Sequence, residues 1–377
     1  MASKNLDDPT LITKRDELKR LAAKLSEQPI IAVDTESNSL YAYQEKVCLI
    51  QFSIPGEDYL VDPLALRELS ALGSVFSSAA IEKVFHAAEY DLIVLQRDFG
   101  FSFVNLFDTM LAARILGWRA VGLSSILKNE FGVHVNKHFQ RANWGQRPLP
   151  AKMLNYARLD THYLIPLRQR QYEELKANNL WPLAEEDFQR ATHVNTPAPN
   201  NDRASCWRIN GAGDLPTKQL AILQELCRYR DRVAKSLNRP LFKVMSNKAL
   251  LELAQTQPRN KKELARVPGV SKRQAERHGR ELLETIQRGA KSQPTYPPPQ
   301  PRPDDQFLER VDRLRNWRKN TARKLGVGSD VVLPRDLLDA LAEHNPQDQA
   351  ELEGVLESVP WRIENFGDQI LYTLQKG

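Results

Sequence analysis

The sequence predicts an α/β domain built on a mixed sheet, followed by two similar all-helical domains. In the first 190 residues, β-branched and apolar runs alternate with helical patterns, as in proteins that combine a sheet with covering helices. Farther along, two segments match each other at an offset of 88 residues without a gap. A chain of 377 residues is long enough for these three domains.

The α/β domain is expected to begin with a short antiparallel meander. The strands we expect are Ile30–Val33, Val47–Ile54, Asp58–Asp62 and Lys83–His86. Gly56 turns the second strand into the third. A helical pattern follows over residues 88–99, and Asp108 and Thr109 supply the N-cap of the next helix. A long helix is expected after Pro150, since proline is tolerated in a first turn.

The repeat specifies the cores of the two helical domains. Matched leucines fall at helical spacing, and they include Leu226, Leu250 and Leu264, which correspond to Leu314, Leu338 and Leu352. Tyr229 and Trp317 occupy the same position and are expected to be core aromatics. Each repeat is large enough to fold by itself.

Composition marks two linkers, one polar and rich in Asn and Pro, the other dominated by proline. The expected domains are residues 1–190 for the α/β domain, 191–210 for a linker, 211–290 for the first helical domain, 291–305 for the proline-rich linker and 306–377 for the second helical domain.

The net charge of +6 is unevenly distributed along the chain. Residues 1–190 carry a net charge of −2, residues 191–290 carry +10 and residues 291–377 carry −2. A basic block beside slightly acidic ones is typical of a protein that binds a polyanion with one domain and processes it with another. A solvated, cation-rich surface would give the same composition.

Several protein classes are disfavoured by what the sequence lacks. It has no run of 18 apolar residues, which argues against a membrane span, and its first residues lack a signal-peptide pattern. Cys48, Cys206 and Cys227 show no CxxC spacing, which argues against a disulfide framework or a zinc site. We therefore expect a protein of the reducing cytoplasm.

Two carboxylates end the first predicted strand, in the stretch IIAVDTES. Asp34 and Glu36 are two residues apart, so their side chains lie on the same face of a strand. Carboxylates placed side by side repel each other, and a divalent cation relieves that repulsion; oxygen ligands suit magnesium or manganese. Taken alone, the pair could also mark a strand that enters solvent at Asp34.

Two further stretches carry acidic residues in suggestive positions. Asp91 follows a strand and falls in the first turn of a helix, where it could lie at the edge of the core or simply complement the helix dipole. Tyr156 and Asp160 are four residues apart and share one face of the late helix. This second pair could also be a tyrosine packed over a solvated aspartate.

Together these motifs resemble the tyrosine branch of the DEDD exonucleases. The flanking stretches VCLIQFS, YLVDPL, LFDTMLAARILG, HFQRANWGQRPLP and MLNYARLDTHYL are similar to ribonuclease D. The segment WRINGAGDLPTKQLAILQELCRYRD and the repeat resemble paired HRDC (helicase and ribonuclease D, C-terminal) domains. The resemblance implies a ribonuclease H-like exonuclease domain followed by two HRDC domains. Ser37 and Asn143 depart from the residues common in that family, which are phenylalanine and aspartate.

The resemblance also implies an activity: hydrolysis of RNA from its 3′ end with release of nucleoside 5′-monophosphates, as in the trimming of transfer-RNA precursors. Asp34 would bridge two divalent ions, Mg²⁺ or Mn²⁺. Glu36 and Asp160 would complete the site of one ion, Asp91 would hold the other, and Tyr156 would orient the attacking water. A monomer without membrane association is expected.

Two alternative functions remain open at the level of sequence. The acidic motifs do not separate RNA from DNA, so a DNA exonuclease is one alternative. A non-catalytic nucleic-acid-binding protein is another, because HRDC units also occur in helicases. No GxxxxGK[ST] phosphate loop is present, which argues against a helicase, and the complete set of carboxylates argues against an inactive enzyme.

Overall fold

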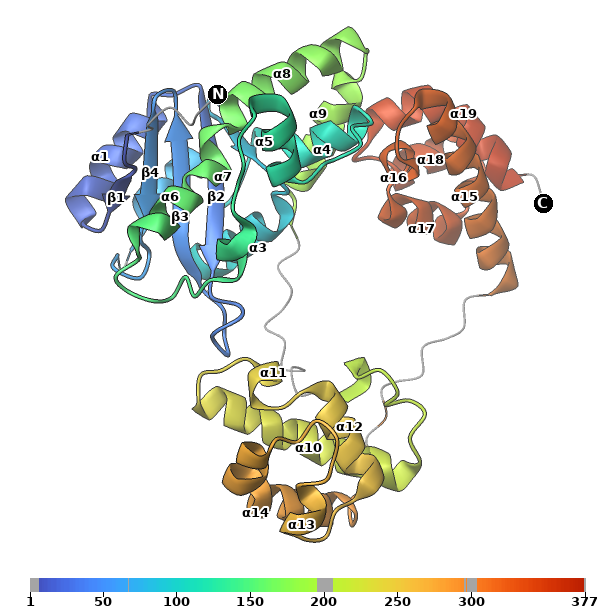
Figure 1. Ribbon diagram of the computed structural model, residues 1–377. Helices are drawn as coiled ribbons and strands as arrows, with labels where there is room; N and C mark the ends of the chain where they lie inside the picture. The colour runs from blue at the N-terminus through green and yellow to red at the C-terminus, as the bar shows by residue number, and fades with distance from the viewer. Residues whose placement is uncertain (1–6, 67, 195–205, 295, 297–303, 376–377) are drawn as a thin grey trace. The chain divides into compact units, whose positions relative to one another are not determined.

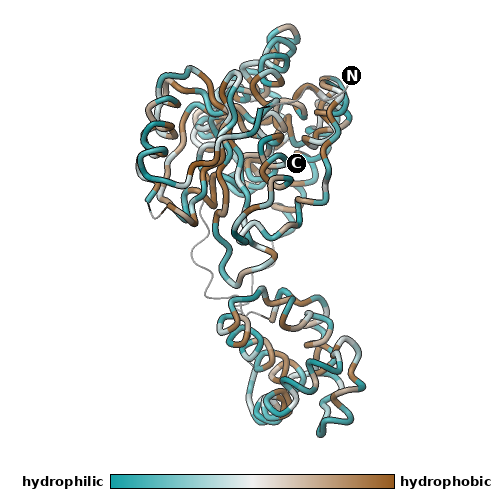
Figure 2. The backbone as a smooth tube through the Cα atoms, turned by 60° about the vertical axis from the view of Figure 1, so that its left-hand side comes forward, coloured by the Kyte–Doolittle hydropathy of each residue, from teal (hydrophilic) through white to brown (hydrophobic). Residues whose placement is uncertain are grey.

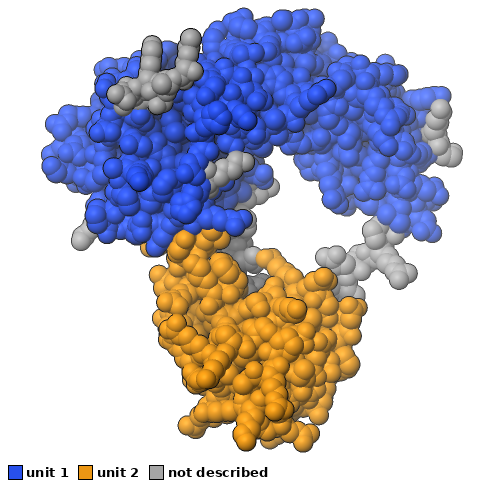
Figure 3. Space-filling view, in the orientation of Figure 1, with its two compact units in different colours: residues 1–37, 47–196, 301–377 blue, residues 38–46, 197–300 orange. Residues whose placement is uncertain are grey.

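The computed structural model describes residues 7–66, 68–194, 206–294, 296 and 304–375. The chain divides into two compact units, which Figure 3 shows in different colours. Unit 1 consists of residues 1–37, 47–196 and 301–377, and unit 2 consists of residues 38–46 and 197–300. Unit 1 therefore contains the second helical repeat together with the α/β domain.

The α/β part of unit 1 is a six-stranded mixed sheet with the order β1-β4-β3-β2-β5-β6 (Figure 1). The strands are β1 (Thr10–Ile12), β2 (Ile30–Ser37), β3 (Val47–Ile54), β4 (Glu57–Val61), β5 (Glu82–Phe85) and β6 (Leu106–Asp108). β2, β3 and β4 form the expected antiparallel meander, whereas β1, β5 and β6 pair in parallel with their neighbours. The predicted fold class is confirmed.

Alternation along β2 assigns each of its side chains to one face of the sheet. Ile31 and Val33 join the core that includes α1 and α3, whereas Ala32 joins a second core on the opposite face. Asp34 and Glu36 continue the face of Ala32. β3 is buried along its whole length, and Figure 2 shows apolar stretches of chain running together through the sheet. The carboxylates of β2 therefore project from an inner strand of a sheet that is covered by other elements.

Helices cover both faces of this sheet. They are α1 (Arg15–Ser26), α2 (Gly73–Phe76), α3 (Glu89–Phe99), α4 (Thr109–Ile115), α5 (Leu123–Phe131), α6 (Ala151–Ala157), α7 (Leu159–His162), α8 (Leu164–Ala177) and α9 (Trp181–Ala191), with short 3₁₀ turns at Ser70–Leu72 and Lys137–Arg141. Asp108 caps α4 as expected, accepting hydrogen bonds from the backbone N–H groups of Met110 and Leu111.

The long helix expected after Pro150 is instead three successive helices, α6, α7 and α8. The backbone tightens at the junction, because the N–H of Thr161 donates to the carbonyl of Arg158, three residues earlier. Arg158 itself keeps helical backbone dihedral angles, so the chain continues to coil across the junction. The four-residue spacing of Tyr156 and Asp160 therefore still directs both side chains toward one pocket.

The second helical repeat forms part of unit 1 and packs against α4 and α9. Its helices are α15 (Asp305–Leu325), α16 (Ser329–Val332), α17 (Arg335–His344), α18 (Gln349–Val355) and α19 (Pro360–Gln375). Val331 and the partly buried Trp361 join the apolar core that lies beneath α4, α8 and α9. Arg362 is fully buried and forms ion pairs with Glu186 and Asp187 of α9.

Unit 2 holds the first helical repeat around its own apolar core. Its helices are α10 (Thr217–Ser236), α11 (Leu241–Val244), α12 (Asn247–Thr256), α13 (Lys261–Leu264) and α14 (Lys272–Gly289), preceded by a 3₁₀ turn at Cys206–Arg208. Residues 38–46 pack on this repeat: the Tyr43 hydroxyl donates to Asp231 at 2.7 Å, and the Lys243 ammonium lies 3.7 Å from the Tyr41 ring centroid. No helix in the described part of the chain is both long and apolar enough to cross a membrane.

Candidate active site

Four of the five predicted site residues line one open cavity of about 430 Å³ in unit 1. Asp34 and Glu36 enter it from β2, and Tyr156 and Asp160 enter it from α6 and α7, which lie across β2 and β3 (Figure 1). Residues 122–125 at the start of α5 also line the cavity, as do His86, Val135 and Gln140. Residues from separate parts of the sequence thus meet over one strand end.

The fifth predicted residue, Asp91, lies behind the cavity wall. It is only 6% exposed and belongs to the first turn of α3. The hydroxyl of Thr35, on β2 between the two strand carboxylates, donates a hydrogen bond to Asp91. Asp91 is near enough to raise the pKa of both Asp34 and Glu36. The four carboxylates therefore form one electrostatic cluster.

Burial raises the pKa of every carboxylate in this cluster, and repulsion from the others raises it further for Asp34, Glu36 and Asp160. For Asp34 and Glu36 burial is the largest cause, followed by the neighbouring carboxylates, and the pKa lies well above the ordinary value. Burial raises the pKa of Asp91 to about 7 and, with a contribution from Asp91, that of Asp160 to about 8. Such a cluster favours protons or cations, either of which removes the repulsion.

Tyr156 is fixed by aromatic packing beside these carboxylates. Its ring centroid lies 6.1 Å from that of Trp144 and 5.6 Å from that of Phe139. Burial and the charges of Asp160 and Glu36 raise the pKa of the phenol above its ordinary value. The hydroxyl therefore remains protonated at neutral pH, which suits a group that positions water and argues against a free phenolate base.

An ion pair joins two of the stretches that carry the sequence resemblance. Arg147 donates to both carboxylate oxygens of Asp62, at 2.6 and 2.7 Å, and to the backbone carbonyls of Cys48, Trp144 and Gln146 at 2.7 Å. This anchors the segment that carries Trp144 to the edge of the site. The sequence contains both stretches but gives no sign of this ion pair, because nothing local links residues 85 positions apart.

The two histidines near the site have structural partners. His86 Nδ1 lies 2.9 Å from the Thr109 hydroxyl, and burial lowers the pKa of this histidine, so it is neutral. His162 Nδ1 lies 2.9 Å from Asp58. Each histidine thus has a partner that accounts for its position. His86 nevertheless lines the cavity wall, as do Ser124 and Ser125, which sequence reasoning missed. The available signal in the sequence was Gly122, which stands before the apolar run of α5 and marks the start of that helix.

The donor chemistry of the cluster suits a hard divalent cation, because all four candidate ligands are carboxylates. The side chains are not, however, already arranged as a metal cage: among the described residues, no group of three or more His, Cys, Asp or Glu side chains has that geometry. Asp34, Glu36 and Asp160 are partly exposed to the cavity and can rotate toward an ion there.

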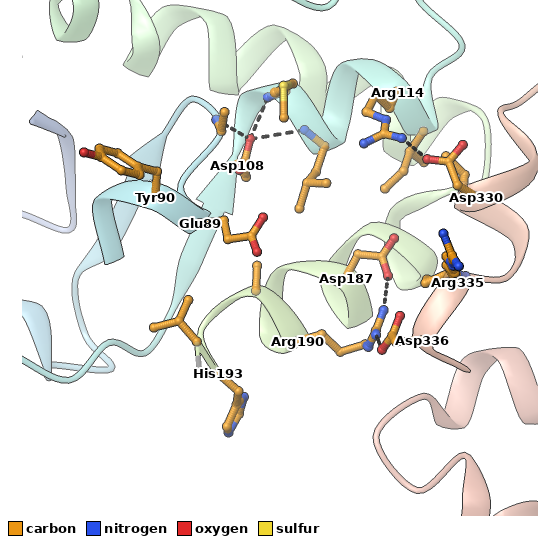
Figure 4. Close-up of a pocket in the computed structure, with 18 of the residues that line it drawn as sticks. Glu89, Tyr90, Asp108, Arg114, Asp187, Arg190, His193, Asp330, Arg335 and Asp336 are labelled. Carbon is orange, nitrogen blue, oxygen red and sulfur yellow. Dashed lines mark hydrogen bonds and ion pairs between the residues drawn. The ribbon is translucent and has the colours of Figure 1, made fainter. Parts of the chain in front are cut away.

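A larger cavity of about 670 Å³ lies elsewhere in unit 1, between α3, α4, α9 and the second helical repeat (Figure 4). Asp34, Glu36, Asp91 and Asp160 are not among its lining residues. Ion pairs cross it between Arg114 and Asp330, and between Arg190 and Asp336 at 2.7 Å. We assign the chemistry to the smaller cavity, because the carboxylate cluster is there.

Comparison with known proteins agrees with this division of the chain. A family model described as 3′–5′ exonuclease matches residues 9–176, and the HRDC domain model matches residues 219–286 and 307–374. Ribonuclease D from Escherichia coli is similar in structure, with a TM-score of 0.67 and 26% identity over 98% of this chain and 99% of that chain. That protein is an exoribonuclease involved in structured RNA processing.

Curated relatives fall into two groups by length. Protein RRP6-like 2 of Arabidopsis thaliana is 38% identical over 64% of this chain, but this chain spans only 29% of that protein's length. Ribonuclease D of Pseudomonas paraeruginosa is 30% identical over 92% of this chain and 93% of its own length. Since that match includes the exonuclease domain and both HRDC repeats, the chain belongs to the ribonuclease D family.

Proposed function

We propose that the protein is a 3′–5′ exoribonuclease that hydrolyses the last phosphodiester bond of RNA and releases nucleoside 5′-monophosphates. The observation that carries this proposal is the meeting of Asp34, Glu36, Tyr156 and Asp160 in one cavity, with Asp91 directly behind them. The family match supports an exonuclease, and its ribonuclease D members support RNA as substrate.

In this proposal each side chain has one task. Asp34, Glu36, Asp91 and Asp160 would hold two divalent ions, Mg²⁺ or Mn²⁺, whose chemistry would be to activate water and to stabilise charge on the leaving oxygen. Tyr156 orients the attacking water through its protonated hydroxyl, and the packing of Trp144 keeps that hydroxyl in place. Thr35 keeps Asp91 oriented through its hydrogen bond.

The first helical repeat is proposed to hold the body of a structured RNA, such as a transfer-RNA precursor. A groove of about 550 Å³ between α10 and α14 is lined by Arg232, Arg277 and Arg288, together with Glu281 and Glu284. All three arginines are exposed, which leaves them accessible to phosphates. Exposed cations gathered around one groove are typical of nucleic-acid binding.

The test of the proposed function offers matched RNA and DNA oligonucleotides, labelled at the 5′ end, to the purified protein with Mg²⁺ or Mn²⁺. We expect a ladder that shortens from the 3′ end on RNA. Asp34→Asn should abolish cleavage while RNA binding persists, because it removes a shared ligand and no phosphate contact. Cleavage by this variant within about tenfold of the wild type, roughly 1.4 kcal/mol of barrier, would contradict the metal assignment.

The role of Tyr156 is tested separately by Tyr156→Phe, which keeps the ring packing and removes the hydroxyl. A water-positioning role predicts a loss of about 10²–10⁴ in kcat with little change in RNA affinity. Single-turnover rates and equilibrium binding separate the two effects. Normal turnover by the phenylalanine variant would leave Tyr156 as a packing residue only.

A further inference from the structure

Gln51 on β3 is a buried polar residue whose environment in the fold is unusual. Its side chain is 0% exposed, and neither its amide nitrogen nor its amide oxygen has a hydrogen-bond partner among the described residues. In the described chain it is the one side chain with both a donor and an acceptor orphaned in this way. A buried amide without partners is costly, so a role that requires it is expected.

The strand register places this amide at the catalytic cluster. Gln51 pairs directly with Asp34 across the antiparallel β2–β3 ladder. Directly opposed side chains lie on the same face, with Cβ atoms typically about 4.5–5.5 Å apart. An amide side chain at that separation reaches a carboxylate opposite it.

The neighbours of Gln51 along β3 show what covers it. Two residues before it, Leu49 joins the apolar cluster of Tyr156 and Ala157. Two residues after it, the hydroxyl of Ser53 donates to the Asp58 carboxylate at 2.6 Å and lies 2.7 Å from the hydroxyl of Thr161. Gln51 therefore lies beneath the α6–α7 turn, the same turn that brings Tyr156 and Asp160 to the cavity.

Gln51 also supplies hydrogen-bond donors, which a cluster of ionised carboxylates needs. The site is crowded with acceptors, since Asp34, Glu36, Asp91 and Asp160 are all carboxylates. A glutamine amide supplies two N–H donors without adding a charge that would compete with a cation. Hydrogen bonds to a carboxylate stabilise its ionised form and fix its orientation.

We propose that Gln51 is a positioning residue of the catalytic centre, whose amide N–H donates to the Asp34 carboxylate when the cluster holds divalent ions. Gln51 thereby fixes the orientation of the carboxylate that the proposed function assigns to both ions. This inference rests on that proposed function, and it assigns Gln51 no contact with substrate.

The test compares Gln51→Met, which keeps the length and apolar volume of the side chain, with Ser53→Ala on the same strand face. Gln51→Met should leave the melting temperature of the metal-free protein unchanged or raise it, because a buried orphaned amide is removed. Its affinity for Mn²⁺, measured by calorimetry, should fall by roughly tenfold or more. Ser53→Ala should do the reverse, lowering the melting temperature while Mn²⁺ affinity stays at the wild-type value.

A third variant, Gln51→Glu, keeps the shape of the side chain but replaces its donors with a carboxylate. It should bind Mn²⁺ with altered affinity and lose kcat more than it raises KM on the RNA oligonucleotide. Wild-type Mn²⁺ affinity in Gln51→Met, or a lowered melting temperature without weaker Mn²⁺ binding, would overturn the proposal. Wild-type protein assayed in parallel separates this outcome from failure of the proposed function, which would appear as no RNA cleavage in the wild type.

Discussion

The two helical repeats share a core pattern but differ in what their surfaces do. Residues 219–286 and 307–374 both match the HRDC domain, and matched leucines are buried in each. The second repeat belongs to the same compact unit as the exonuclease domain, whereas the first forms the other unit. The shared positions therefore specify a fold, and the divergent positions decide what that fold binds.

The docking face of the second repeat shows where the sequences diverge. Its contacts with α4 and α9 use Val331, Asp336 and Arg362. At the offset of 88 residues the first repeat has Lys243, Lys248 and Gln274 in these positions. An apolar residue, an acid and a buried arginine are thus replaced by two exposed lysines and an amide. Gln274 lacks the charge that Arg362 offers to Glu186, and Lys248 lacks the carboxylate that Asp336 offers to Arg190.

In the groove of the first repeat, charged residues stand where the second repeat has uncharged ones. Arg232 and Arg277 line it, and the corresponding residues of the second repeat are Asn320 and Asn365. The fold accepts asparagine at both positions, so the core does not require the arginines. Their charge fits the proposal that this groove contacts RNA phosphates.

The largest effect is expected at the docking face, for Arg362→Gln. The substitution gives the second repeat the residue that the first repeat has at this position. It leaves Glu186, which is 5% exposed, without its guanidinium partner, whereas Asp187 keeps Arg190 at 3.6 Å. We expect a loss of about 3–5 kcal/mol in the stability of unit 1, as for other broken buried ion pairs. Differential scanning calorimetry measures it.

The two-unit architecture provides the internal control for this experiment. The transition of unit 2 should keep its temperature, since Arg362 belongs to unit 1. Adding Glu186→Gln should recover part of the loss, because the uncompensated charge is then removed. An Arg362→Gln protein that melts like the wild type would show that the two repeats do not differ at this face in the way proposed.

Much of the fold could be predicted because its signals are local. The strands of the meander, the Asp108 cap and the leucine pattern of the repeats each depend on neighbouring residues, and the structure has them. The membership of the second repeat in unit 1 depends on partners such as Glu186 and Arg362, which are 176 residues apart. No periodicity in the sequence encodes that pairing.

The residues of the candidate site likewise divide into those that local sequence signals reveal and those that they do not. Asp34, Glu36, Tyr156 and Asp160 could be singled out because two local spacings place each pair on one face. Gln51 could not, because its sequence context is an ordinary apolar strand, and only the β2–β3 register places it opposite Asp34. The break of the expected long helix at Arg158 was also invisible, since its residues keep helical spacing.

A smaller effect is expected in the groove of the first repeat, for the double variant Arg232→Asn with Arg277→Asn. Each substitution installs the residue of the second repeat. If both arginines contact phosphates, affinity for a transfer-RNA precursor should fall by roughly fivefold per lost contact at 0.1 M salt, and the salt slope by roughly 0.7 per contact. Binding is measured in EDTA, so that cleavage does not interfere.

Equal charge loss on the second repeat is the control for this variant. Arg323→Asn with Lys324→Asn removes two exposed cations from α15 and should leave both affinity and slope unchanged. The same loss in both double variants would mean that net charge alone, and not the groove, holds the RNA.

The smallest effect is expected at the aromatic position that the repeats share, occupied by Tyr229 and Trp317. In the first repeat, Tyr229 is 4% exposed and its hydroxyl lies 2.9 Å from His278 Nδ1. Tyr229→Phe removes this bond and keeps the ring, so unit 2 should lose about 0.5–1.5 kcal/mol in unfolding free energy.

In the second repeat, Trp317 makes only a long hydrogen bond of 3.3 Å to Gln369, at an exposed site. Gln369→Ala should therefore change the stability of unit 1 by less than Tyr229→Phe changes that of unit 2. Calorimetric transitions of the two units measure both values, and a larger loss for Gln369→Ala would show that the polar partner of the aromatic matters more in the docked repeat.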